Sequence, residues 1–234
     1  MKFMDKAKNI PQCERLAFEI PTNGDEKIDF HLNIKSDFYK YKLLQWLTIQ
    51  EKIDIKWQYL RVFIAKWIKN NEYAAISGIF LEFDYSKRED FNLPSFFVKV
   101  NKELSLKTDI FSEIFDSLFP KEKSSKFIDT IKKIESLIPN YSSINYIGFM
   151  LSRPEQMIRI NINGLYQSDF IPFLKSLAWE GKYAELDYWA NFTTSNSDKV
   201  ILSFDLLENK VLDKIGLEVF IEKQPDIDYR WQIF

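Results

Sequence analysis

The chain has 234 residues, of which 46% are hydrophobic and 28% charged, and its formal net charge is −2. These values are typical of a folded globular protein and exclude a disordered or fibrous chain. The near-neutral charge gives no electrostatic basis for binding nucleic acid. With one cysteine (Cys13) and one histidine (His31), the sequence also excludes an internal disulfide and a zinc cage of Cys and His ligands.

Residues 1–8 carry charges where a secretory signal needs an unbroken apolar segment, and nowhere do about 18 apolar residues follow one another. We therefore expect a cytoplasmic protein that has no membrane partner.

Four segments alternate apolar and polar residues on both sides of a turn, a pattern that predicts β-hairpins. The first surrounds the turn residues 21–25, and the third surrounds a turn at Pro154. The hairpins are predicted at about 15–34, 78–100, 146–163 and 199–222.

Between the hairpins the apolar spacing becomes helical, and each gap holds a pair of predicted helices. They lie at about 36–50, 57–68, 110–118 and 124–137, with a last pair divided at Gly181. The chain is therefore predicted to be one α+β domain over residues 1–234, built from four ββ(αα) repeats.

One face of each hairpin is apolar and should pack against the helices, whereas the other is mostly polar. The polar face either meets bulk water in an open sheet or lines the lumen of a closed barrel. We favour an antiparallel eight-stranded barrel with outer helices, because closure removes the sheet edges and because short polar residues such as Asn161 and Ser203 suit a crowded lumen.

This order of elements resembles the ABBA aromatic prenyltransferases, in which αββα units close into an antiparallel barrel with a polar lumen. The resemblance extends over the whole chain and lies in element order, without a shared sequence motif, and barrels of that family usually have ten strands. The order is also similar to the tunnelling fold, whose unit is ββααββ. Two tandem units would then span 15–100 and 147–222, with the barrel formed by oligomerisation.

Acidic residues outnumber basic ones on the predicted inner face. The acids are Glu19, Asp29, Glu82, Asp84, Asp205, Glu218 and Glu222, and the bases are Arg15, Lys99 and Arg159. Glu82 and Asp84 should lie about 7 Å apart, from a rise of roughly 3.3 Å per residue, while Asp205 and Glu218 can face each other across the fourth hairpin. Carboxylates this close favour a bound cation. Alternatively, they pair with the three bases or face water.

The candidate ligand-binding residues are Glu82, Asp84, Lys99, Arg159, Asn161, Asp205 and Glu218. These residues favour a binding or accessory domain that receives a small polar or cationic ligand or a peptide segment. We expect this domain to be a monomer or small oligomer and to need no cofactor.

The alternative that the resemblance implies is a group-transfer enzyme that uses an allylic diphosphate. It needs lysines and arginines around the diphosphate and aromatic rings, such as Tyr146 and Phe80, around the allyl cation. Mg²⁺ held by Glu82, Asp84 or Asp205 could supplement the few basic residues. The sequence identifies no catalytic residue for either function.

Overall fold

The computed structural model describes residues 10–19, 28–53, 57–69, 73, 76–85, 93–100, 109–151, 153, 155 and 157–234. Eight strands form one antiparallel sheet, and their order in space equals their order in the sequence. They are β1 (Arg15–Glu19), β2 (Ile28–Ile34), β3 (Ile76–Tyr85), β4 (Ser95–Val100), β5 (Ser143–Phe149), β6 (Ile158–Asn163), β7 (Lys199–Leu207) and β8 (Lys210–Phe220).

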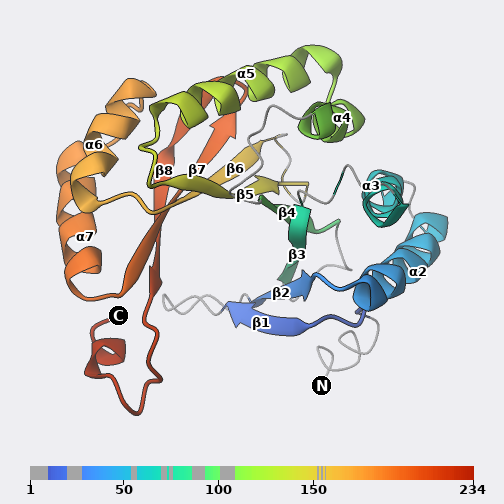
Figure 1. Cartoon of the computed structure of the whole chain (residues 1–234), viewed down its shortest axis with the longest axis horizontal. Helices are drawn as coiled ribbons and strands as arrows, with labels where there is room; N and C mark the ends of the chain where they lie inside the picture. The colour runs from blue at the N-terminus through green and yellow to red at the C-terminus, as the bar shows by residue number, and fades with distance from the viewer. Residues whose placement is uncertain are drawn as a thin grey trace.

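Six described helices lie in pairs between the hairpins, as the helical spacing predicted. They are α2 (Asp37–Ile53), α3 (Gln58–Lys69), α4 (Asp109–Leu118), α5 (Lys121–Leu137), α6 (Gln167–Ser176) and α7 (Tyr183–Ser195). Figure 1 shows the strands curving around the centre of the molecule while the helix pairs lie outside them.

The hydrophobic core lies between the sheet and this outer layer of helices. Alternate strand residues such as Leu32, Leu81 and Ile160 are fully buried there, because strand residues two apart point to the same face. Aromatic rings fill much of the space, and the rings of Phe96 and Phe149, on neighbouring strands, stack with centroids 4.7 Å apart. The sheet therefore presents its apolar face outward to the helices and its other face inward.

The predicted α+β class and the antiparallel eight-stranded sheet are confirmed, but the predicted closure of the barrel is not found. Among the described residues, β1 pairs with β2 alone and β8 with β7 alone. In the part of the chain that the structure describes, β1 and β8 therefore each keep one unpaired edge. The inner wall consequently has an open side at β8, where Lys214 and Glu218 are exposed, whereas Asn161 and Ser203 are buried.

The last residues fold back beside α7, outside the sheet. The short helix η3 (Tyr229–Gln232) follows Asp228, whose carboxylate accepts hydrogen bonds from the backbone and guanidinium of Arg230. Arg230 also forms an ion pair with Asp198, 2.9 Å away, in the connection between α7 and β7. This packing places Phe234 against Phe192 of α7, with ring centroids 5.7 Å apart.

Candidate functional site

Polar residues collect in rows on the inner face of the sheet. Inner-face residues that are in register on neighbouring strands form a row across the sheet. One row, from β4 to β8, contains Lys99, Tyr146, Asn161, Ser203 and Gly216. The adjacent row, from β3 to β7, contains Phe80, Phe97, Gly148, Arg159 and Asp205. The strand register thus brings residues far apart in the sequence onto one surface.

Two local features shape this surface. The register shifts next to Tyr146 and around Asp205, and such bulges re-aim side chains and increase strand twist. At Gly148, a Cβ atom would lie 2.4 Å from the ring of Phe97. A glycine at this position therefore lets the Phe97 ring lie across β5.

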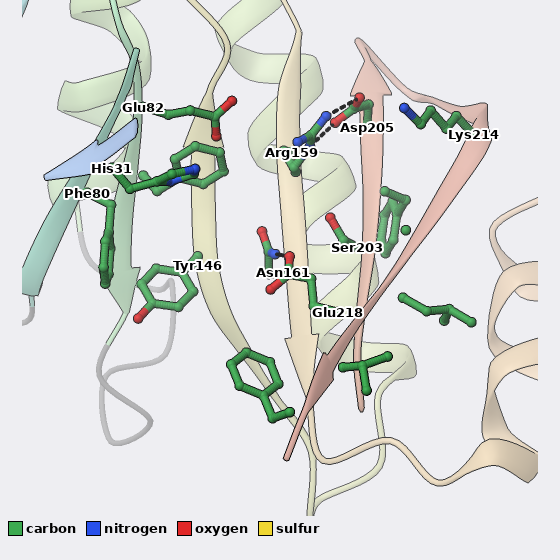
Figure 2. Close-up of a pocket in the computed structure, with 16 residues that line it drawn as sticks. His31, Phe80, Glu82, Tyr146, Arg159, Asn161, Ser203, Asp205, Lys214 and Glu218 are labelled. Atoms are coloured by element: carbon green, nitrogen blue, oxygen red, sulfur yellow. Dashed lines mark hydrogen bonds and ion pairs between the residues drawn. The ribbon is translucent and has the colours of Figure 1, made fainter. Parts of the chain in front are cut away.

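The rows line a cavity of about 640 Å³, within the usual range for small-molecule sites. Five of the seven predicted site residues line it: Glu82, Arg159, Asn161, Asp205 and Glu218. The cavity wall also includes Ser203 and Lys214 (Figure 2), which the sequence prediction did not include among the site residues. An inward-facing position on a strand was the only sequence signal for these two.

Arg159 and Asp205 form a mostly buried ion pair in the cavity wall. Nε of Arg159 lies 2.7 Å from Oδ1 of Asp205, and Nη2 lies 3.0 Å from Oδ2, a bidentate geometry. Burial alone would lower the pKa of Arg159, but the hydrogen bonds and attraction of Asp205, with smaller contributions from Glu82 and Glu218, raise it. The guanidinium therefore stays charged, with three carboxylates around it.

Glu82 faces this pair from the opposite side of the cavity. Its side chain is 7% exposed, and Figure 2 shows its carboxylate directed into the cavity from β3, toward Arg159. His31 of β2 is its register partner and also lines the cavity. The cavity therefore has a buried carboxylate on one wall and a guanidinium–carboxylate pair on the other.

Asn161 presents a polar atom without a partner among the described residues. Its Nδ2 donates a short hydrogen bond to Oε1 of Glu218, which assigns the amide orientation. Its Oδ1 is buried and accepts no hydrogen bond in the part of the chain that the structure describes. A buried acceptor left unsatisfied costs about 1–3 kcal/mol. Asn161 Oδ1 is thus an acceptor suited to a ligand N–H.

The predicted pairing of Asp205 with Glu218 is wrong. In the β7–β8 register Glu218 is opposite Ile201, and the shift between Phe204 and Leu206 leaves Asp205 outside the regular pairs. Glu218 instead bonds Asn161, and Asp205 bonds Arg159. A bulge of this kind cannot be located from alternation alone.

Lys99 and Asp84, the other two predicted site residues, do not belong to the described cavity lining. The side chain of Asp84 lies outside the described residues. Lys99 occupies the same inner-face row as Tyr146, and its Nζ lies 5.8 Å from the centre of that ring. Burial lowers the pKa of Lys99, and the positive charges of Lys35 and Lys199 lower it further. Lys99 thus belongs to a group of three lysines beside the cavity.

Tyr146 lies between Lys99 and Asn161 in its inner-face row. Its ring packs edge-on against Phe80, with centroids 5.1 Å apart. Burial, and then the charge of Glu218, raise the pKa of its phenol to about 12. The phenol is therefore protonated at neutral pH and can donate a hydrogen bond.

The described residues can be examined for a metal site and for a membrane-spanning helix. In the described part of the chain, no three or more His, Cys, Asp or Glu side chains form a cluster that could hold a metal ion. Asp205 is bonded by Arg159 and the side chain of Asp84 lies outside the described residues, so the Mg²⁺ site considered above stays a prediction. None of the described helices combines the length and the apolar character needed to cross a membrane.

The fold is similar to that of a solved aromatic prenyltransferase. A search of solved structures finds the crystal structure of 6-dimethylallyltryptophan synthase from Micromonospora olivasterospora in complex with DMASPP and Trp, with a TM-score of 0.55 and 11% sequence identity. The match covers 85% of this chain and 61% of that protein, so this chain spans about three-fifths of its length. At this identity the likeness shows the fold alone. No protein-family model and no curated protein matches the sequence.

Proposed function

We propose that the protein binds a small organic cation in the inner cavity, with an ammonium or guanidinium group between Glu82 and Asn161 and an aromatic or apolar body against Tyr146 and Phe80. The sequence favoured binding of a small polar or cationic ligand or a peptide segment. Among these, the proposal specifies an organic cation.

The observation that carries the proposal is Asn161 Oδ1, a buried acceptor in the cavity wall without a described partner. Because Nδ2 of the same amide is bonded to Glu218, the amide cannot be rotated without placing its oxygen against a carboxylate. A ligand that donates an N–H would satisfy Oδ1 and recover the desolvation cost.

The charges of the wall support the same ligand class. The described lining contains the carboxylates of Glu82, Asp205 and Glu218, but the guanidinium of Arg159 already bonds Asp205. Lys214 is the other cationic side chain of the described lining, and it is exposed on the edge strand β8. A ligand cation in the cavity would add an opposite charge beside these carboxylates.

Tryptamine is a suitable probe, because it combines an ammonium group with an aromatic body and because the structural neighbour was solved with Trp bound. Isothermal titration should show tryptamine binding that Glu82→Gln and Asn161→Leu each weaken by about tenfold or more, the effect expected for a lost charged hydrogen bond. Glu122→Gln on the outer surface of α5 is the control and should leave the affinity unchanged. Equal affinities in all four proteins would refute the proposal.

A second candidate is transfer of an allylic group from a diphosphate, as the fold of the neighbour suggests. The observation in its favour is the position of Lys99 near Lys35 and Lys199, since an anion would relieve their repulsion of the Lys99 ammonium. Tyr146 and Phe80 would then adjoin the allyl group. Titration with dimethylallyl diphosphate, with and without Mg²⁺, tests this candidate: binding that Lys99→Gln abolishes supports it, and an absence of binding in both conditions rejects it.

A further inference from the structure

Lys99 lies on the inner face of β4 without an acidic partner. In the part of the chain that the structure describes, no carboxylate forms an ion pair with its ammonium group. The side chain is only partly exposed. A charged group that is partly removed from water is stabilised by a counterion. The position of Lys99 therefore suits the binding of an anionic group.

Two further lysines increase the positive charge around Lys99. Gly78 of β3 is the register partner of Lys99, and a Cβ atom at Gly78 would lie 2.9 Å from Cγ of Lys35. The aliphatic part of Lys35 therefore lies over Gly78, on the strand that adjoins β4. Burial, and then the charges of Lys35 and Lys199, lower the pKa of Lys99. An anionic group beside Lys99 would offset this repulsion and favour the ammonium form.

Two aromatic side chains separate Lys99 from the proposed cation site. Along their inner-face row, Tyr146 lies between Lys99 and Asn161. On β3, Phe80 lies between the register partner of Lys99 and Glu82. The two rings line the inner cavity and lie side by side in Figure 2, with centroids 5.1 Å apart. Nζ of Lys99 lies 5.8 Å from the centre of the Tyr146 ring. A ligand body that covers both rings would therefore have Glu82 and Asn161 at one end and Lys99 at the other.

From this arrangement we infer that the ligand of the inner cavity is dipolar, with an ammonium group and a carboxylate at opposite ends of an aromatic body. The ammonium group occupies the proposed cation site, and the carboxylate contacts Nζ of Lys99. The inference rests on the proposed function and deepens it, because it names the class of molecule that carries the cation. Asn161 and Lys99 are two strand spacings apart, about 10 Å, so the two charges must be well separated on the ligand.

Two isomers test the inference on the full chain. 4-(2-Aminoethyl)benzoate carries its ammonium and carboxylate groups at opposite ends of the ring, whereas phenylalanine has the same atoms with both charged groups on one carbon. 2-Phenylethylamine has the ring and the ammonium group alone. In calorimetric titrations, 4-(2-aminoethyl)benzoate should bind about tenfold or more tightly than 2-phenylethylamine, the effect expected for an added charged hydrogen bond. Phenylalanine should show no such advantage.

Variants of Lys99 assign the position of the carboxylate. Lys99→Gln should remove the advantage of 4-(2-aminoethyl)benzoate over 2-phenylethylamine, whereas Lys99→Arg keeps the charge and should retain most of it. Both variants should fold, because Lys99 is partly exposed and has no ion pair among the described residues. Lys132→Gln, on the exposed surface of α5, is the matched control and should leave the advantage unchanged.

Glu82→Gln separates this inference from the proposed function. It should weaken the binding of 4-(2-aminoethyl)benzoate and of 2-phenylethylamine by a similar factor, because both place an ammonium group beside Glu82. If phenylalanine binds as tightly as its isomer, or if the advantage of the isomer persists in Lys99→Gln, the dipolar ligand is overturned while the proposed function stands. If binding of the amines is absent or indifferent to Glu82→Gln, the proposed function fails, and the dipolar ligand fails with it.

Discussion

Arg159 and Asp205 are register partners on β6 and β7 and form a bidentate ion pair on the inner face of the sheet, with N–O distances of 2.7 and 3.0 Å. Because both side chains are mostly buried, the pair fixes the orientation of a charged wall of the cavity. It also leaves the carboxylate of Asp205 unavailable as the main partner of a ligand cation. Glu82 and Asn161 therefore become the principal candidates for binding the ligand.

Asp205→Asn should destabilise the protein by about 2–4 kcal/mol, since removing one partner of a mostly buried ion pair leaves the other charge poorly compensated. Urea unfolding monitored by circular dichroism measures the change. Glu208→Gln is the control, because it removes an ion pair with Lys126 in which both side chains are more than two-fifths exposed. That change should cost less than about 1 kcal/mol. Equal losses in the two variants would contradict a structural role for the Arg159–Asp205 pair.

Gly148→Ala should destabilise the protein by about 1–3 kcal/mol, the usual cost of overpacking, because the added Cβ would lie 2.4 Å from the Phe97 ring. Gly216→Ala is the control, at an inner-face glycine of the adjacent row. Its added Cβ would lie 3.4 Å from Cβ of Ser203, so the stability should change little. Thermal and urea unfolding of both variants measure the difference. Adding Phe97→Leu to Gly148→Ala should recover part of the loss, and an unaffected Gly148→Ala variant would show that the Phe97 ring does not lie over β5.

Tyr146 should make the protein less stable as the pH rises from about 10 to about 12. Its phenol has a pKa raised to about 12 in the folded state, from an ordinary value of 10.0. Between these values the unfolded chain loses the proton that the folded chain retains, so unfolding is favoured. Tyr146→Phe removes this contribution, and its stability should therefore fall less steeply over this range. Urea unfolding at a series of pH values measures the two curves, and parallel curves would contradict the raised pKa.

The arrangement of the elements could be predicted from the sequence because it depends on local periodicity. Alternation on both sides of a turn identified hairpins such as 199–222, and the helical spacing identified the pairs between them. The open edges could not be predicted, since closure depends on the curvature accumulated over all eight strands and not on any one segment.

The composition of the inner-cavity lining could be predicted from the sequence, but the pairing of its residues could not. Inner-face alternation selected Glu82, Arg159, Asn161, Asp205 and Glu218, all of which line the inner cavity. Their partners depend on the bulge around Asp205 and on the register of β6 with β8 across β7, which the sequence pattern does not contain. Lys99 lies on the same face, but the charges that act on its pKa are those of Lys35 and Lys199. Which of these side chains come together around the cavity depends on the three-dimensional arrangement of the strands.

A crystal structure with 5-bromotryptamine would show whether the inner cavity holds an organic cation between Glu82 and Asn161. We expect an anomalous bromine peak inside the cavity near Tyr146 and Phe80, with the ammonium group in hydrogen-bond contact with Asn161 Oδ1 and the Glu82 carboxylate. A bromine peak only on the outer surface of the molecule, with ordered water alone against Asn161 and Glu82, would contradict it.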